Sequence, residues 1–360
     1  MEEPLGEINL AVQKATLQAR GNSIKKRMKR DPARPSAKWV APARVGREEG
    51  KALAVVLSTI GCAHARSDSG GCTMCSYLLD GVHEQLTAEQ IVAQFQTALK
   101  EIETAAPPIS IKIYTSGSFF DDEEIPPEAR TQILRLISRD ERIREVIIES
   151  RPEYVSESIL STLRAVLADR NIEIGMGLES ADDTIRAVCI NKAFNLHSFK
   201  DALRTAKKYN VGIRAYVLLK PPFLTERDAL LDAISTIEEA RKMGVTTISL
   251  NPVNVQKETL VEKLWIKGNY RPPWLWSVIE VLRRGTSTSD KWMKIVCDPV
   301  AGGKPRGAHN CGKCDSDIME AIRRFSLKQD PTAIQNLSCD CINQWEHVLK
   351  HEDFSLVVHR

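Results

Sequence analysis

The sequence predicts an α/β fold of six strand–helix repeats, followed by a small C-terminal unit rich in cysteine. Apolar runs rich in β-branched residues recur between residues 53 and 251, and segments with Leu and Ile at helical spacing separate them. A parallel sheet with right-handed crossovers accounts for this alternation. Two architectures satisfy it: an open doubly wound sheet and a partial (β/α)6 barrel. In both, functional side chains gather at the carboxyl ends of the strands.

The expected elements follow one another in a regular order. The predicted strands are residues 53–59, 109–115, 144–150, 172–178, 211–219 and 245–251. The predicted helices between them are residues 86–104, 127–139, 155–170, 198–209 and 226–243. We expect a capping box at the start of the first of these helices, because Thr87 is followed by Gln90 three residues later.

Composition excludes several classes of protein. The chain has 360 residues, of which 42% are hydrophobic and 27% charged, and this balance is typical of a globular fold and not of a disordered chain. No apolar run reaches the roughly 18 residues that a transmembrane helix needs, so we expect no membrane association. The N-terminus lacks the basic and then apolar pattern of a secretory signal. We therefore expect a soluble cytoplasmic protein.

The net charge of +3 is unevenly distributed. Residues 11–47 carry eleven Lys and Arg side chains and a single Asp, and they include a possible helix at about residues 8–29 and a Pro-rich stretch. A basic arm of this kind suits a polyanionic partner. We expect a basic N-terminal arm at residues 1–49, the repeats at 50–255 and a Cys-rich accessory domain at 256–360.

Three cysteines form a loop directly after the first predicted strand. Cys62, Cys72 and Cys75 have the spacing C-x9-C-x2-C. Grouped cysteines in a protein without an export signal are typical of metal ligands and not of disulfides. Three thiolates can hold three irons of a 4Fe-4S cluster and leave the fourth iron open to a ligand. The alternative is a zinc site in which His64 is the fourth ligand.

A second group of cysteines lies near the C-terminus, and its members are Cys311, Cys314, Cys339 and Cys341. Two short cysteine pairs of this kind predict a tetrahedral zinc site of four thiolates. Cys297 and His309 are competing ligands, and a second iron–sulfur cluster or a pair of buried thiols are the other interpretations. Cys189 stands alone in an apolar helix, and we expect it in the core.

The position of the first cysteine loop resembles that of the radical S-adenosylmethionine superfamily, and its long spacing is similar to that of the Elongator catalytic subunit family. This resemblance selects the partial TIM-type barrel and implies that the cofactors are a 4Fe-4S cluster and S-adenosylmethionine. It places the cofactor-binding residues at the strand ends: Met74, Ser116, Gly117, Ser118, Glu149, Arg151, Gly177, Glu179, Asn251 and Asn254. Arg151 can pair with the methionine carboxylate through its planar guanidinium.

The sequence as a whole resembles one branch, the radical S-adenosylmethionine subunits of archaeosine synthase. This resemblance rests on the first cysteine loop, the C-terminal cysteine pairs and the segments TSGSFFD (115–121), ESRPEYV (149–155), GLES (177–180), LLKPPFLTE (218–226) and NPVNVQKETLVEKLW (251–265). It implies a tRNA substrate whose D-loop bears a 7-deazaguanine base with a lysine attached by a transglycosylase-like alpha subunit. A 5′-deoxyadenosyl radical would initiate cleavage of the carbon–nitrogen bond in the side chain of that lysine, which gives archaeosine.

Basic side chains are the expected tRNA contacts, because phosphate contacts dominate nucleic-acid affinity. They are Arg20, Lys25, Lys26, Arg27, Lys29 and Arg30. Lys220 follows the fifth strand, where we expect it to contact the substrate or a carboxylate. The resemblance also implies an electron donor. The alternative functions are another radical tRNA-modifying enzyme, either Elongator-like or methylthiotransferase-like, and a non-catalytic tRNA-binding iron–sulfur subunit.

Overall fold

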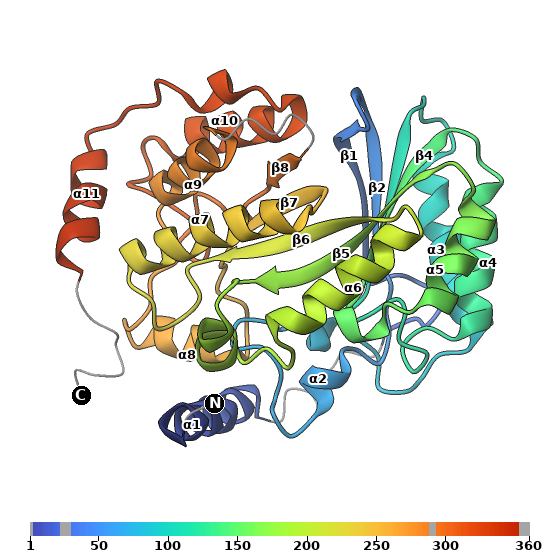
Figure 1. Ribbon diagram of the computed structural model, residues 1–360, viewed down its shortest axis with the longest axis horizontal. Coiled ribbons are helices and arrows are strands. Elements are labelled where there is room, and N and C mark those ends of the chain that lie inside the picture. Colours follow the sequence, from blue (N-terminus) through green and yellow to red (C-terminus); the bar gives the residue numbers. More distant parts are fainter. Residues whose placement is uncertain (1–2, 22–29, 288–292, 353–360) are drawn as a thin grey trace.

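The computed structural model describes residues 3–21, 30–287 and 293–352. They form one eight-stranded sheet with the strands in sequence order from β1 to β8. The strands are β1 (Ala37–Val45), β2 (Glu48–Val56), β3 (Ile109–Tyr114), β4 (Ile143–Glu149), β5 (Asn171–Glu179), β6 (Gly212–Leu219), β7 (Thr247–Pro252) and β8 (Lys294–Cys297). Only β1 and β2 pair antiparallel, and every other neighbouring pair is parallel. The sheet curls into the predicted partial barrel, which is open between β1 and β8 (Figure 1).

Helices cover the outer face of the sheet. The crossover helices are α3 (Ala88–Leu99), α4 (Pro127–Ser138), α5 (Glu157–Leu167), α6 (Leu196–Lys208) and α7 (Glu226–Met243). The others are α1 (Glu3–Arg20), α2 (Ala63–Arg66), α8 (Leu260–Ile266), α9 (Leu275–Ser287), α10 (Asp315–Lys328) and α11 (Ile342–His351). A π-helix spans Ile185–Ile190, and short 3-10 helices span Tyr77–Asp80, Lys100–Ile102, Pro152–Tyr154 and Pro331–Ile334. The predicted capping box is confirmed at Thr87 and Gln90.

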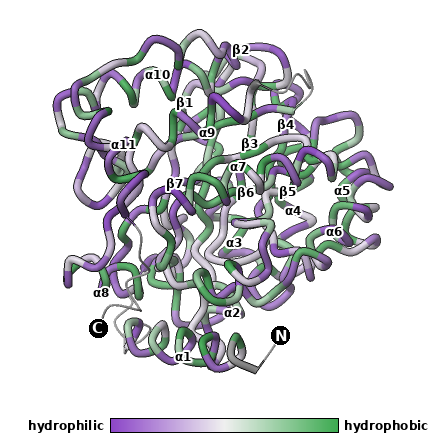
Figure 2. The backbone as a smooth tube through the Cα atoms, turned by 60° about the vertical axis from the view of Figure 1, so that its left-hand side comes forward, coloured by the Kyte–Doolittle hydropathy of each residue, from purple (hydrophilic) through white to green (hydrophobic). Residues whose placement is uncertain are grey.

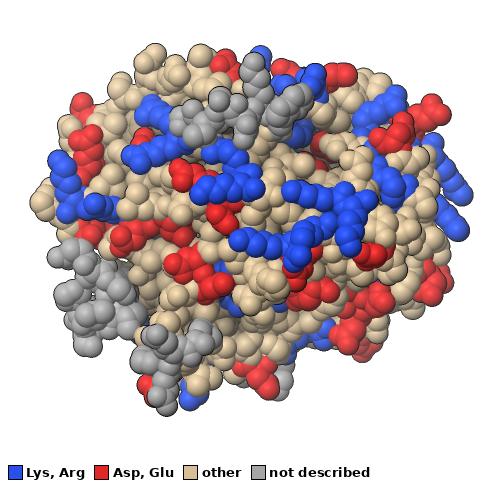
Figure 3. Space-filling view, viewed as in Figure 1, with Lys and Arg blue, Asp and Glu red and all other residues tan. Residues whose placement is uncertain are grey.

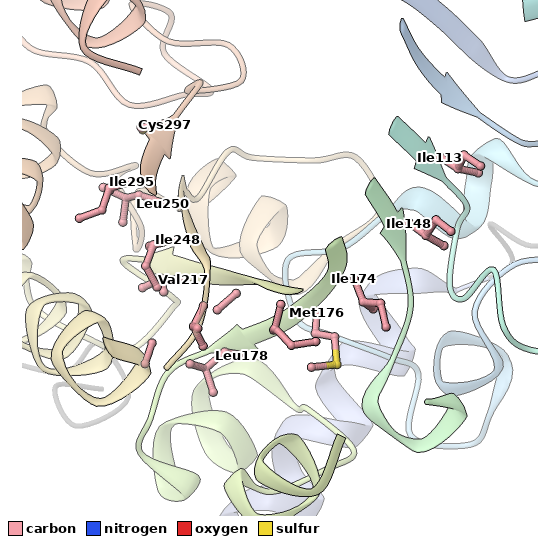
Figure 4. Close-up of a cluster of buried hydrophobic side chains, with 14 of the residues drawn as sticks. Ile113, Ile148, Ile174, Met176, Leu178, Val217, Ile248, Leu250, Ile295 and Cys297 are labelled. Carbon is pink, nitrogen blue, oxygen red and sulfur yellow. The ribbon is translucent and has the colours of Figure 1, made fainter. Parts of the chain in front are cut away.

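The two faces of the sheet differ in chemistry because side chains alternate along a strand. Ile113, Ile148, Ile174 and Ile248 belong to one buried apolar cluster between the strands and the helices (Figure 4). Along the backbone tube, hydrophobic and hydrophilic colours alternate along the covering helices, as expected of helices with one buried face (Figure 2). The strands therefore rest on the helices through their outer face, as the periodicity predicts.

The inner face of the barrel is polar. Arg214 of β6 donates to Glu173 of β5 over 3.0 Å, and Thr247 of β7 donates to the same carboxylate over 2.6 Å. Burial favours a high pKa for Glu173, but Arg214 and its cationic neighbours outweigh burial and hold that pKa below its usual value. A closed TIM barrel fills this space with bulky apolar side chains. Polar side chains here leave the interior suited to a polar ligand.

Two segments join the sheet from outside the six expected repeats. Residues 37–45, which the charge pattern places in the arm, form β1 and pair along their whole length with β2. Pro42 argues against a strand when the sequence is considered alone, because proline has no N–H to donate to a neighbouring strand. It is tolerated here because β1 is an edge strand. At the other edge, β8 lies in the segment expected to be an accessory domain, and it pairs with β7.

The described helices include none with the length and apolar character needed to cross a bilayer. The helices at the C-terminal end instead pack on the same core as the barrel, since Trp276, Phe325 and Trp345 belong to its apolar cluster. This C-terminal part therefore shares its core with the repeats.

Candidate active site and metal centre

The first cysteine loop leaves the carboxyl end of β2 and is held by a segment that follows β5. Asn191, at the end of the π-helix, donates through Nδ2 to the carbonyls of Ser69 (2.8 Å) and Gly71 (2.7 Å). Thr73 of the loop donates through its N–H to the carbonyl of Ile190 (3.0 Å). Each of the three cysteines is free and partly buried. The loop is thus fixed by backbone contacts, while its thiols remain available to a ligand.

His64 lies in the same loop, and both of its ring nitrogens are engaged. Nε2 lies 2.7 Å from the carbonyl oxygen of Asn191, and Nδ1 lies 3.0 Å from Oγ of Ser69. Burial lowers the pKa of His64 to about 4, so the imidazole is neutral at physiological pH. Neither nitrogen is directed at the thiols, which disfavours the zinc site with His64 as the fourth ligand.

The spacing of the loop thiols also disfavours a single metal ion. Thiolates on one zinc lie about 3.8 Å apart, because each Zn–S bond is about 2.3 Å and the geometry is tetrahedral. Among the described residues, Cys62, Cys72 and Cys75 do not belong to a group of side chains gathered closely enough to share one metal ion. A four-iron cluster binds each thiolate at a different iron and so accepts a wider spacing. The geometry therefore fits the cluster better.

The glycine-rich segment after β3 meets the cysteine loop at close range. A Cβ atom on Gly117 would lie 2.6 Å from Cα of Cys62 and would overlap Oε1 of Glu124, so only glycine fits there. Glu124 accepts from the N–H of Ser118 (2.9 Å) and from Oγ1 of Thr59 (2.8 Å). Burial raises the pKa of Glu124 to about 7. This carboxyl group ties the glycine-rich segment to the end of β2.

The next two strand ends add a group of charged side chains. The N–H of Arg151, after β4, donates to Oγ of Ser118 over 2.9 Å. This hydrogen bond joins the segment after β4 to the glycine-rich segment after β3. At the end of β5, Glu179 pairs with Lys192 over 2.9 Å. Burial raises the pKa of Glu149 to about 8, partly against the attraction of Lys192. Carboxyl, guanidinium and ammonium groups thus converge beside the cysteine loop.

The remaining predicted cofactor-binding residues lie on the same side of the barrel. Asn251 accepts from Oγ of Ser249 (3.2 Å), and Asn254 accepts from Nε2 of Gln256 (3.4 Å). Gln256 in turn accepts from the N–H of Ser76, the residue after Cys75 (2.7 Å). A Cβ atom on Gly177 would lie 2.5 Å from Nζ of Lys192, so β5 and the segment after the π-helix are in contact. Met74 packs on a small apolar cluster beside the loop.

Lys220 is buried and paired with a carboxylate, so its ammonium group is not free to bind a substrate. It is buried at the end of β6, and its Nζ lies 2.6 Å from Oε2 of Glu226. Its carbonyl accepts from the hydroxyl of Tyr270 (2.7 Å). Of the two partners expected for Lys220, the structure supplies the carboxylate. The side chain therefore links the barrel to the segment beyond β7.

The basic arm is only partly described. Lys25, Lys26, Arg27 and Lys29 lie outside the described residues. Arg30 pairs with Asp80 over 3.3 Å. Arg20 is only 3% exposed and donates to the carbonyl of Cys75 over 3.1 Å. The expectation that Arg20 contacts a tRNA phosphate is therefore not what the structure shows, because its guanidinium turns inward.

The C-terminal cysteines converge on one point. The sulfur of Cys311 lies 4.0 Å from that of Cys314 and 3.8 Å from that of Cys339, and the sulfurs of Cys314 and Cys341 lie 3.7 Å apart. All four lie within 4.8 Å of one another. These separations are close to the roughly 3.8 Å between thiolates on one tetrahedral zinc ion. The sequence prediction that the two pairs share a site is confirmed, and the identity of the metal stays a prediction.

Donors around this centre favour thiolates. Nε1 of Trp276 donates to Sγ of Cys341 (3.2 Å), and Nδ2 of Asn310 donates to Sγ of Cys314 (3.4 Å). The competing ligands are elsewhere. Cys297 is buried in β8, and Nδ1 of His309 faces the carbonyl of Gly307 at 2.8 Å. Neither belongs to the convergent group.

Several residues that shape the site have no signature in the sequence. Asn191 and Lys192 follow a short π-helix, Glu124 sits in a turn, and Arg20 lies 55 residues before its partner Cys75. Each is a single polar residue outside any motif spacing. Their role in the site is visible only from the contacts that they make with distant parts of the chain.

Comparison with known proteins decides the family. The chain is 41% identical over 335 residues to the archaeosine synthase subunit beta of Methanosarcina acetivorans, covering 92% of this chain and 95% of that protein. It is 38% identical over 314 residues to the archaeosine synthase subunit beta of Thermococcus kodakarensis, covering 87% and 96%. The chain belongs to the archaeosine synthase subunit beta family. The family resemblance drawn from the sequence motifs is confirmed.

No family model matches the sequence. Among solved structures, Elp3 of Methanocaldococcus infernus with an N-terminal deletion aligns with a TM-score of 0.48 and 16% identity, over 64% of this chain and 59% of that one. Methylornithine synthase aligns with a TM-score of 0.46 and 14% identity, over 82% and 71%. The barrel assignment therefore rests on the strand order of this protein itself.

Proposed function

We propose that this protein is a radical S-adenosylmethionine enzyme of tRNA modification. Its substrate is a lysine attached to a 7-deazaguanine base in the tRNA D-loop, and cleavage of the carbon–nitrogen bond in the side chain of that lysine yields archaeosine. One observation carries the proposal: three free thiols meet a glycine-rich turn and a charged cluster at the carboxyl ends of β2 to β5, in a member of the archaeosine synthase subunit beta family.

The residues present fit the two cofactors. Cys62, Cys72 and Cys75 would each bind one iron. The residues that would hold S-adenosylmethionine are Met74, Ser116, Gly117, Ser118, Glu149, Arg151, Gly177, Glu179, Asn251 and Asn254. When bound, cluster and cofactor together supply a 5′-deoxyadenosyl radical that abstracts hydrogen from an unactivated carbon.

The protein's own side chains orient the reactants. The guanidinium of Arg151 can hold a carboxylate, and Gly117 lets the backbone approach a ligand closely. Burial raises the pKa of Cys75 to about 12, so the thiol keeps its proton until a metal displaces it. Cluster assembly therefore releases protons at the loop.

The polar interior of the barrel supports a polar substrate. Burial, together with the nearby Arg214, lowers the pKa of Lys112 to about 8. Within the described part of the chain Lys112 forms no ion pair, although Glu145 and Asp298 attract its charge from farther away. A cation in this position suits a substrate that bears a carboxylate, as the lysine adduct does.

The proposed partners follow from the family. The name subunit beta supports a companion alpha subunit, a transglycosylase-like enzyme that attaches the lysine. The substrate is tRNA, and an electron donor reduces the cluster. Lys and Arg side chains form a band across one face of the molecule, which suits a polyanion (Figure 3).

The test is reconstitution without oxygen. Full-length protein is loaded with iron and sulfide and then incubated with a chemical reductant, S-adenosylmethionine and tRNA bearing the lysine adduct. Mass spectrometry is expected to find archaeosine in the tRNA and 5′-deoxyadenosine in equal amount. Formation of 5′-deoxyadenosine without a change in the base would point to another substrate. A fully loaded protein that forms neither product would be a binding subunit.

We further propose that Cys311, Cys314, Cys339 and Cys341 hold one zinc ion. After aerobic purification we expect about one zinc per protein molecule, because zinc has no redox chemistry. Elemental analysis of the wild-type protein and of a Cys339→Ser/Cys341→Ser variant measures this, and the variant is expected to lose the metal. Wild-type protein without zinc, or with iron well beyond one cluster, would contradict the assignment.

We also propose that the undescribed basic residues Lys25, Lys26, Arg27 and Lys29 bind tRNA phosphates, together with Arg30. A Lys25→Ala/Lys26→Ala variant is expected to bind tRNA more weakly. Plotted as log affinity against log salt concentration, the salt dependence should become shallower, its negative slope shrinking in magnitude by about 0.7–0.9 for each lost contact. Filter binding at several salt concentrations measures the slope.

The matched control for the arm is Arg323→Ala/Arg324→Ala, which removes two exposed cations from α10. If both double variants change the slope equally, the arm has no special role. If the arm variant leaves the slope unchanged but weakens binding to the alpha subunit, the arm binds the partner protein.

A further inference from the structure

The N-terminal helix α1 ends against the first cysteine loop. Two views of the molecule show α1 beside α2, the short helix of that loop (Figures 1 and 2). A Cβ atom on Gly70 would lie 3.0 Å from Cα of Leu17, and one on Gly71 would lie 3.0 Å from Nη2 of Arg20. Both glycines have positive φ, at +72° and +78°. The loop therefore lies against the last turns of α1, where a side chain at Gly70 would meet the backbone of Leu17.

Apolar packing holds α1 in this position. Val12 and Ala19 are buried in a small cluster with Leu260 of α8. Nδ2 of Asn9 donates to the carbonyl of Ala187 in the π-helix over 2.5 Å. α1 is thus anchored to α8 and to the π-helix independently of the arginine that its last turn bears.

Arg20 brings an uncompensated charge to the loop. It is 3% exposed, and Nη2 donates to the carbonyl of Cys75, while Nε is buried without a hydrogen-bond partner. Within the described parts of the protein, no carboxylate forms an ion pair with it. A buried guanidinium without an anion is costly.

We propose that Arg20 compensates the charge of the iron–sulfur cluster and positions Cys75. The inference rests on the proposed function, since it requires a cluster on Cys62, Cys72 and Cys75. A four-iron cluster with three thiolate ligands is anionic, and one-electron reduction by the external donor makes it more negative by one charge. A fixed cation in a poorly solvated site favours the more negative state. Arg20 therefore raises the reduction potential of the cluster.

Two substitutions separate charge from shape. Arg20→Gln keeps a hydrogen-bond donor and removes the charge, whereas Arg20→Lys keeps the charge. The full-length proteins are reconstituted, and the midpoint potential is measured by reductive titration followed by electron paramagnetic resonance. The Gln variant is expected to hold the same iron and sulfide at a more negative potential, and the Lys variant to remain near wild type.

The control is Lys14→Gln, which removes an exposed cation from the same helix. Its potential should not move, because water and salt screen a surface charge. An unchanged potential in Arg20→Gln, with a lower melting temperature, would show a purely structural residue and overturn the proposal.

A variant that loses the cluster altogether also gives an answer. If Arg20→Gln loses it and Arg20→Lys retains it, the charge is required, as proposed. If both lose it, the guanidinium serves only the backbone of Cys75, and the role in charge compensation is overturned. A wild-type protein that takes up no cluster would instead refute the proposed function, and that result appears before any variant is compared.

Discussion

Replacing Cys62, Cys72 or Cys75 by alanine is expected to abolish both the iron–sulfur chromophore and the cleavage of S-adenosylmethionine. Each thiolate would bind a different iron, so the other two cannot substitute for the one that is lost. His64 cannot replace it either, because both of its nitrogens are engaged by Asn191 and Ser69. Iron and sulfide content, the visible absorbance and 5′-deoxyadenosine formation measure the effect.

Cys189→Ala is the matched control. Cys189 is a buried cysteine that packs beside the loop, and its backbone carbonyl accepts from Oγ1 of Thr73, a contact that alanine keeps. We expect an intact cluster, near wild-type cleavage and a stability loss of about 1 kcal/mol. If any single variant of the loop cysteines retained full cleavage, the assignment of the three ligands would be wrong.

Lys220→Met is expected to be the most destabilising of the non-cysteine substitutions. The Lys220 and Glu226 side chains are 4% and 1% exposed, so the variant leaves a buried carboxylate without its cation. Glu226 also accepts from the N–H of Trp274 (2.8 Å) and from Oγ of Ser277 (2.6 Å), which ties it to α9 and the segment before it. Breaking a buried pair of this kind costs about 3–5 kcal/mol. Denaturant unfolding of the full-length protein measures the loss.

An exposed ion pair supplies the comparison. Lys208 and Glu157 lie 2.8 Å apart, but their side chains are 64% and 58% exposed, so Lys208→Met should destabilise the protein far less than Lys220→Met does. The double variant Lys220→Met/Glu226→Gln should be more stable than Lys220→Met alone, because a neutral amide removes the unpaired charge. Equal losses for Lys220→Met and Lys208→Met would contradict a structural role for the buried pair.

Local patterns in the sequence were sufficient to predict the repeats. The six predicted strands correspond to β2 to β7, and the five predicted helices to α3 to α7. Their apolar residues recur at the period of the element itself, so the pattern needs no information from distant residues. The same holds for the C-terminal cysteines, whose two short spacings match the convergence of four sulfur atoms.

The edges of the sheet could not be predicted in this way. β1 contains Pro42 and is half exposed, and β8 has only four residues. Neither shows a clear alternation, and each is a strand because a neighbouring strand offers unpaired backbone groups. Pairing with β2 and β7 supplies the hydrogen bonds that the local sequence does not signal.

The direction of single charged side chains was likewise decided only by the tertiary structure. Arg20 stands among basic residues in the sequence, and such a run is typical of an exposed surface. The apolar contacts of α1 instead place its last turn against the cysteine loop, where the guanidinium meets the carbonyl of Cys75. Lys220 becomes a buried partner of Glu226 because both lie where the barrel meets α9. Residue spacing along the sequence does not predict such contacts, because the burial of a side chain depends on which distant segments pack together.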